Sequence, residues 1–89
     1  MLPENQKKAY DAFYASARNN TILSSRETLL IHVAASLSTG CAPWMEHYLG
    51  VAKEEGITEE QIGAVQAIVM AVTCARVNAQ LRTVQGWSS

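Results

Sequence analysis

Residues 38–48 read Ser38-Thr39-Gly40-Cys41-Ala42-Pro43-Trp44-Met45-Glu46-His47-Tyr48, and this stretch decides how the chain is arranged. An apolar segment runs into it, and a second helical pattern begins inside it. Gly40 suits the left-handed backbone that follows many helix C-termini. Pro43 suits the first turn of a helix, where its missing N–H would be unpaired anyway. The stretch therefore predicts a turn between two helices, with Cys41 at or just before the N-terminus of the second.

Helix signals flank this turn on both sides. Ser24 and Glu27 have the spacing of a capping box, so a helix is expected from there to about Ser38. The helix after the turn should run from about residue 42 to just before Gly56, which suits its C-terminal cap. Its expected inward stripe follows helical periodicity and consists of Met45, Tyr48, Leu49 and Ala52.

Two further helices are expected at the ends of the chain. Pro3 suits a first helical position, and apolar residues recur at helical spacing over about 3–18. Thr58 and Gln61 form a second capping box, which begins a helix over about 59–84 that Gly86 closes. Residues 86–89 then form a tail. Because no strand signal is present, the fold class is all-α, a single domain of about four helices over residues 1–89.

Composition excludes several function classes. The 89 residues carry 7 Lys plus Arg against 8 Asp plus Glu, and these charges are scattered, so no nucleic acid partner is expected. The N-terminus lacks the layout of a signal peptide. The longest run of low polarity, Ile62–Ala75, is too short to span a bilayer of about 30 Å. We expect a cytoplasmic protein with no membrane partner, and its two cysteines do not form a disulfide framework.

The amount of apolar sequence predicts self-association. The helices over 24–38 and 59–84 are apolar on nearly every side, although a four-helix chain must leave part of each on its surface. Another copy of the chain would cover this excess, so a homo-oligomer is expected. The alternative is an alanine-rich surface that tolerates water.

The order of these signals resembles the carboxymuconolactone decarboxylase and AhpD-like (alkylhydroperoxidase D-like) family. The resemblance covers about residues 24–80, and its most specific parts are Thr39-Gly40-Cys41 and Gly56-Ile57-Thr58-Glu59-Glu60-Gln61-Ile62. It implies an AhpD-like helical bundle that assembles as a trimer or hexamer.

The same resemblance implies an altered active site. AhpD-like peroxidases carry Cys-x-x-Cys-x-x-x-His and a proton-relaying glutamate twelve residues before the first cysteine. Their two thiols reduce a hydroperoxide and close to a disulfide. In this chain Cys41 matches the first cysteine, but Trp44, Tyr48 and Leu29 stand where the second cysteine, the histidine and the glutamate are expected. The standard dithiol mechanism is therefore expected to be absent.

Each cysteine has two interpretations. Cys41 could be a peroxidatic thiol, activated at a helix N-terminus and later reduced by an external thiol. It could also be a small buried apolar residue without chemistry. Cys74 lies among apolar residues and is interpreted as structural; the alternative is a resolving thiol, which requires its Cα atom to lie within about 7 Å of that of Cys41.

Four more residues are weaker candidates. His32 could take over proton transfer from the missing glutamate, or it could be a buried neutral histidine bonded to a neighbour. His47 could lie at the surface or beside Cys41. The Tyr48 hydroxyl could donate to a ligand or pack in the core, since its usual pKa near 10 makes it a poor base. Trp44 could fill the former peroxide pocket or form a wall of an apolar ligand site.

Three functions follow from these residues. The first is a divergent thiol peroxidase or redox protein that uses Cys41; the second is a catalytically silent oligomer with a binding or structural role. The third, lactone decarboxylation, ranks last because residues 38–48 offer no arginine to hold a carboxylate. No cofactor is expected. No metal is expected either, because Cys41, Glu46, His47 and His32 lack the paired spacing of a zinc site.

Overall fold

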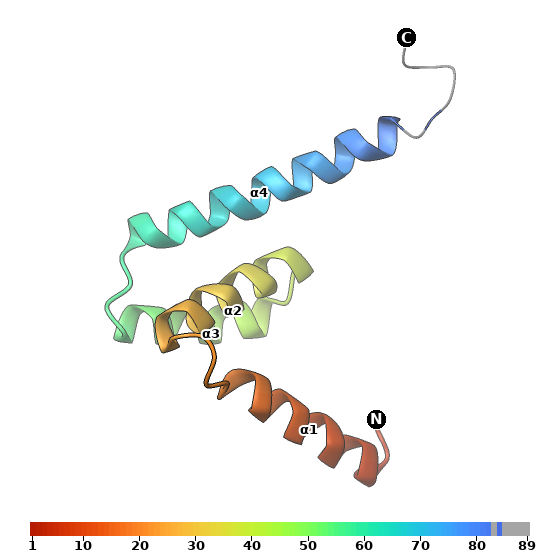
Figure 1. Ribbon diagram of the computed structural model, residues 1–89, viewed down its shortest axis with the longest axis vertical. Helices are drawn as coiled ribbons and strands as arrows, with labels where there is room; N and C mark the ends of the chain where they lie inside the picture. Colours follow the sequence, from red (N-terminus) through yellow and green to blue (C-terminus); the bar gives the residue numbers. More distant parts are fainter. Residues whose placement is uncertain (83, 85–89) are drawn as a thin grey trace.

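The computed structural model describes residues 1–82 and 84, which form four α-helices and no strand (Figure 1). The helices are α1 (Glu4–Arg18), α2 (Ser25–Thr39), α3 (Ala42–Glu54) and α4 (Glu59–Arg82). The all-α prediction is confirmed, and the expected boundaries agree to within one or two residues. Pro3 is the N-cap of α1 rather than its first helical residue. The expected closure at Gly86 and the tail over 86–89 lie outside the described residues.

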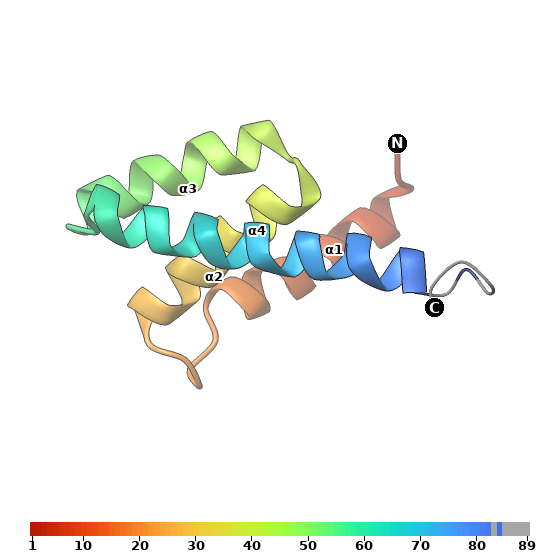
Figure 2. The ribbon, with the colours of Figure 1, turned by 90° about the horizontal axis from the view of Figure 1, so that it is seen from above.

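The core lies where α2 meets α3 and α4. α2 and α3 form a hairpin, and α4 runs along one side of it (Figure 2). Val33 is completely buried, and Tyr48 and Ala52 from α3 are exposed by only 5% and 1%. The whole buried apolar core is small and consists of Leu29, Val33, Tyr48, Ala52 and Ile57. This small core positions the α2–α3 turn and the aromatic side chains around it.

A left-handed glycine ends α2 as the sequence predicts. Gly40 has φ 69°, its N–H donates to the Leu37 carbonyl at 3.3 Å, and the Cys41 N–H donates to the Ser36 carbonyl at 3.1 Å. These two bonds are those of a Schellman motif, which satisfies carbonyls at the helix end. The Cys41 carbonyl in turn accepts from the Met45 N–H at 2.9 Å. Cys41 is therefore the N-cap residue of α3.

Both predicted capping boxes are present. The Ser24 hydroxyl accepts from the Glu27 N–H at 3.0 Å, and the Ser24 N–H donates to the Glu27 carboxylate at 2.8 Å. The backbone N–H bond from Ser24 is the main reason that the pKa of Glu27 lies below its usual value. Thr58 and Gln61 form the same pair of bonds at the start of α4, at 2.9 and 3.1 Å.

Much apolar surface is left exposed. α1 and α4 contain no buried residue, and the ring of Phe13 on α1 is 72% exposed. The predicted inward stripe of α3 is wrong at Leu49, which is 37% exposed because no helix covers that side of α3 closely. The single chain therefore does not bury all the apolar residues that its sequence supplies.

α4 also differs from the expectation that no segment could cross a bilayer. Within residues 1–82 and 84, it is the one helix that is long and apolar enough to do so. Its 24 residues extend for about 36 Å, whereas the expectation rested on the shorter uncharged run Ile62–Ala75. Core helices of soluble proteins have the same length and composition.

We predict opposite effects for alanine at two glycines with equally open surroundings. A Cβ atom added at Gly40 or at Gly50 would meet no atom within 4 Å, but only Gly40 has positive φ. Gly40→Ala should lower the free energy of unfolding by about 1 kcal/mol. Gly50→Ala, inside α3, should raise it by about 0.5–1 kcal/mol. Urea denaturation measures both, and equal effects would contradict a left-handed turn at Gly40.

Candidate functional site

Aromatic rings from α1, α2 and α3 meet beside the α2–α3 turn. The ring of His32 stacks on Tyr48 with centroids 4.3 Å apart, and Trp44 stacks on Tyr14 at 5.2 Å. Trp44 also lies parallel to Tyr48 at 5.7 Å, and His47 meets Tyr48 edge-on at 5.0 Å. Such ring pairs add specific stabilisation to the burial of area. We call these five side chains, Tyr14, His32, Trp44, His47 and Tyr48, the aromatic cluster.

The two tyrosine hydroxyls of the cluster are hydrogen-bonded to each other, which ties α1 to α3. Burial raises the pKa of Tyr48 to about 12, and the bond to Tyr14 acts in the same direction. Tyr48 therefore keeps its proton at neutral pH. It can donate a hydrogen bond, but it cannot serve as a base in place of the histidine that the resemblance implies.

His32 is held in one tautomer by the helix that carries it. Its Nδ1 lies 2.9 Å from the Thr28 carbonyl oxygen, which can only accept a hydrogen bond. Nδ1 is therefore the protonated nitrogen, and Nε2 of the neutral ring is left as an acceptor. His32 is half-buried, and not buried as one of its two interpretations expected, and its bond to Thr28 leaves the other nitrogen suited to take a proton.

Cys41 opens onto a pocket of about 160 Å³ between the aromatic cluster and the end of α2. Its thiol is free and half-buried. The pocket walls are mostly apolar, with two hydroxyls and one imidazole among them. The lining residues are Tyr14, His32, Ala35, Ser36, Thr39, Cys41, Trp44 and Tyr48. We call this space the Cys41 pocket.

The fold brings together four of the six candidates from the sequence. Cys41, His32, Trp44 and Tyr48 all line the Cys41 pocket. Trp44 remains 42% exposed and forms a wall of the pocket, so its ring does not close this space. Tyr48 fits both of its interpretations, because it is buried and lines the pocket.

The other two candidates lie elsewhere. His47 is exposed and does not line the Cys41 pocket, although its ring touches Trp44 and Tyr48. Cys74 is a free, exposed thiol on α4, and no residue of α4 lines this pocket. Cys74 therefore does not pack in the core of this chain, contrary to its interpretation as a structural residue.

Leu29 occupies the position at which the resemblance implies a glutamate. Leu29 is 7% exposed and belongs to the core, and it does not line the Cys41 pocket. His32, one turn further along α2, does line it. Glu27, the nearest carboxylate upstream, is engaged in the capping box. His32 is thus the titratable side chain of α2 that faces the same space as Cys41.

A second pocket, of about 390 Å³, lies on the other side of the His32–Tyr48 stack. His32 and Tyr48 line both spaces, so the stacked pair forms a shared wall. This second space also contains Arg18 and His47, together with Asn20 and other residues of the α1–α2 connection. We call it the Arg18 pocket. Its chemistry differs from that of the Cys41 pocket because it offers a fixed positive charge and two imidazoles.

The sequence analysis missed Tyr14 and Arg18. The Arg18 guanidinium carbon lies 5.8 Å from the centroid of the Tyr14 ring, a distance suited to a cation–π contact. The statement that no arginine is available therefore holds only for residues 38–48, because α1 supplies one from outside this stretch. The spacing of Tyr14 and Arg18 by one helical turn was visible in the sequence, but the contact of α1 with Tyr48 was not.

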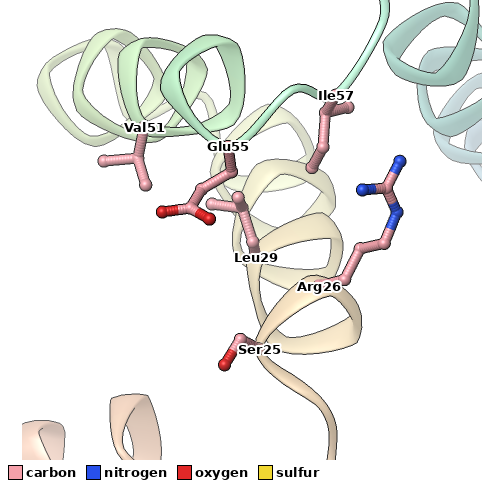
Figure 3. A pocket seen from close by; sticks show the side chains of 6 residues that line it. All are labelled: Ser25, Arg26, Leu29, Val51, Glu55 and Ile57. Carbon is pink, nitrogen blue, oxygen red and sulfur yellow. The ribbon is translucent and has the colours of Figure 1, made fainter.

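A third pocket, of about 330 Å³, lies between the start of α2 and the end of α3 (Figure 3). Leu29 and Ile57 lie beside it, and the guanidinium of Arg26 points away from the carboxylate of Glu55. Arg26 instead donates to the Gln61 side chain at 2.9 Å, which links α2 to the cap of α4. None of the sequence candidates lines this pocket, so it is a less suitable site for chemistry.

Within residues 1–82 and 84, no group of three His, Cys, Asp or Glu side chains is placed to share an ion.

The raised pKa of Tyr48 predicts a loss of stability in alkali. The unfolded chain ionises Tyr48 near pH 10 and the folded chain near pH 12, so unfolding becomes easier as the pH rises through this window. At pH 11 the loss should be about 1 kcal/mol relative to pH 9. Urea titrations at both pH values measure it. Tyr48→Phe should lack this part of the loss, and an identical drop in the variant would contradict the assignment.

The comparison with protein families agrees with this fold. The model of the carboxymuconolactone decarboxylase family matches residues 5–85, and so includes α1, which the resemblance over about 24–80 left out. No curated protein matches the chain significantly. No solved structure does so either. Because the family model spans nearly the whole chain, this protein belongs to the carboxymuconolactone decarboxylase family.

Proposed function

We propose that this chain is a single-thiol hydroperoxide reductase, in which Cys41 attacks the substrate and His32 handles the proton. The observation that carries the proposal is that Cys41 and His32 line one small pocket, with the acceptor nitrogen of His32 left unbonded by Thr28. A thiol that shares its site with an imidazole is the usual arrangement for an activated cysteine. Family membership supports the proposal, because the family includes AhpD-like peroxidases.

Cys41 lies at the N-terminus of a helix. Cys41 is the N-cap of α3, where the unpaired N–H groups and the helix dipole stabilise negative charge. The half-buried thiol is reached through the open pocket and is not sealed in the core. Proton transfer to Nε2 of His32 would complete the activation.

The reaction balances without a second cysteine. The Cys41 thiolate attacks the distal oxygen of the hydroperoxide, an S–O bond forms and the O–O bond breaks. The leaving alkoxide takes the proton held by His32, which yields an alcohol and a sulfenic acid on Cys41. One external thiol then forms a mixed disulfide and releases water. A second external thiol releases the disulfide and restores Cys41.

The reductant must come from outside this pocket. Trp44 replaces the second cysteine, and Cys74 lies on a helix that does not line the site. The neutral Tyr48 hydroxyl is suited to donate a hydrogen bond to a peroxide oxygen, but not to receive the proton. The mainly apolar walls favour an organic hydroperoxide over hydrogen peroxide.

We predict that turnover depends on Cys41 and on His32. With cumene hydroperoxide as substrate and a small dithiol as reductant, Cys41→Ser should abolish alcohol formation. His32→Gln should lower kcat/KM by about 10²-fold, since general-base catalysis typically contributes this much. Chromatography of the alcohol measures both. Cys74→Ser, which removes the exposed thiol of α4, should retain full activity.

Two outcomes would reject the proposal. The first is turnover that survives Cys41→Ser, because the chemistry would then not use this thiol. The second is a wild-type protein without turnover whose Cys41 forms no sulfenic acid in hydroperoxide, as judged by a sulfenic-acid-trapping reagent and mass spectrometry. Circular dichroism of each variant separates loss of chemistry from loss of fold.

The Arg18 pocket supports a second candidate function, the decarboxylation of a carboxylated lactone. This is the activity that the family's name describes. The Arg18 guanidinium suits the substrate carboxylate or lactone carbonyl, and His32 or His47 could return a proton to carbon after carbon dioxide leaves. The bond that breaks joins carbon to the carboxylate, and its electron pair passes into the lactone system. No thiol takes part.

The two candidates give opposite results with the same variants. A decarboxylase should release carbon dioxide from a carboxymuconolactone, and this activity should survive Cys41→Ser. Arg18→Gln should raise KM or abolish turnover. If the protein releases no carbon dioxide at high enzyme concentration, decarboxylation is excluded. The hydroperoxide assay is expected to be insensitive to Arg18→Gln.

A further inference from the structure

One row of oxidisable rings crosses the candidate site. The ring of Tyr14 lies 5.2 Å from Trp44 and 6.4 Å from Tyr10, centroid to centroid, and both pairs are stacked. Trp44 in turn stacks on Tyr48 at 5.7 Å. We call these four side chains, Tyr10, Tyr14, Trp44 and Tyr48, the Tyr–Trp row. It contains all three tyrosines of the chain and one of its two tryptophans.

The row has an inner and an outer end. Tyr48 is 5% exposed, and it lines the Cys41 pocket together with Tyr14 and Trp44. Tyr10 lies one turn before Tyr14 on α1, is 54% exposed and does not line this pocket. The row therefore leads from the Cys41 pocket to the surface of α1.

Rings of this kind can pass an oxidising equivalent from one to the next. Indole and phenol groups are the ring side chains that lose one electron most readily, and electron transfer between rings in contact is fast. A phenol must also release its proton when it is oxidised. The hydroxyls of Tyr14 and Tyr48 are hydrogen-bonded to each other, so a hydrogen atom can pass directly from Tyr14 to a radical on Tyr48. The other rings of the row that line the pocket are thus both linked to Tyr14.

We propose that the Tyr–Trp row is a radical-transfer path, which carries one-electron oxidising equivalents from the Cys41 pocket to Tyr10. The oxidant is an alkoxyl radical, which forms together with hydroxide when a reduced metal ion in solution splits the O–O bond of an organic hydroperoxide. This radical takes one electron and the N–H proton of Trp44, which yields an alcohol and a neutral tryptophan radical. Tyr14 returns an electron and a proton to Trp44, and Tyr10 then does the same for Tyr14. An external thiol finally gives a hydrogen atom to Tyr10 and leaves as a thiyl radical.

The path would protect the thiol in the pocket from one-electron oxidation. Cys41 shares the pocket with three rings of the row, which compete with its sulfur for a radical that forms there. Tyr10 holds the radical on an exposed ring of α1, where a small reductant can reach it. The inference goes beyond the proposed two-electron reductase and does not depend on it, because the row would transfer radicals even if Cys41 were unreactive.

Selective oxidation of Trp44 tests the path. The background variant Trp87→Phe removes the other tryptophan, which lies outside the described residues. Azide radicals generated by pulse radiolysis oxidise tryptophan preferentially, and the visible absorption of its radical differs from that of a tyrosyl radical. We expect the Trp44 radical to decay into a tyrosyl radical at a rate independent of protein concentration. A nitroso spin trap and peptide mass spectrometry should then find the main adduct on Tyr10.

Two hydroxyl deletions separate the path from the docking of α1. Tyr14→Phe should lower the Tyr10 adduct at least about tenfold, because the ring remains but the phenol that relays the radical is lost. Tyr48→Phe removes the same hydrogen bond but leaves the Tyr14 relay in place, so it should keep the adduct. Phe13→Tyr is the control for exposure, since Phe13 lies outside the row and its ring is 72% exposed. The tyrosine that it introduces should carry less adduct than Tyr10.

Any of four results would overturn the proposal. The first is a Trp44 radical that yields no tyrosyl radical, and the second is a Tyr10 adduct that Tyr14→Phe leaves unchanged. The third is a larger adduct on the tyrosine introduced by Phe13→Tyr than on Tyr10. The fourth is an equal loss of adduct in Tyr14→Phe and Tyr48→Phe, since undocking of α1 would then explain both. Circular dichroism confirms the helix content of every variant.

Discussion

The left-handed backbone at Gly40 is the constraint on which the site depends. This residue lets the chain reverse between α2 and α3, and the Cys41 N–H closes the turn on the Ser36 carbonyl. The reversal places Cys41 at the start of α3 and brings Tyr48 against His32 of α2. A turn of another geometry would separate the thiol from the imidazole, because the two side chains share a pocket without a hydrogen bond to hold them together.

Local signals in the sequence predicted the turn, both capping boxes and the four helices, because each depends on neighbours within a few residues. Such local signals do not predict contacts between residues that are far apart in the sequence. The pairing of Tyr14 with Tyr48 and the approach of Arg18 depend on how α1 docks, which helical periodicity does not specify. The exposure of Leu49 was missed for a similar reason. An inward stripe can be read from a sequence, but not whether another helix covers it.

The aromatic cluster separates two pockets that offer different chemical groups. On one side, the Cys41 pocket offers a thiol and mainly apolar walls; on the other, the Arg18 pocket offers positive charge and imidazoles. His32 and Tyr48 serve as the common wall, and the pKa of Tyr48, raised to about 12, keeps its hydroxyl neutral there. Trp44 and Tyr48, which stand where the resemblance implies the second cysteine and the histidine, thus line the pocket of Cys41 with aromatic rings.

The central claim is that the fold makes Cys41 a reactive thiol. The most direct measurement is the rate at which an organic hydroperoxide oxidises Cys41 at neutral pH, in native Cys74→Ala protein and in the same protein unfolded in urea. Our account predicts that the native thiol reacts at least about tenfold faster, because the α3 N-terminus and His32 act only in the folded chain. An equal or slower native rate would contradict it, and Cys41 would then be a packing residue.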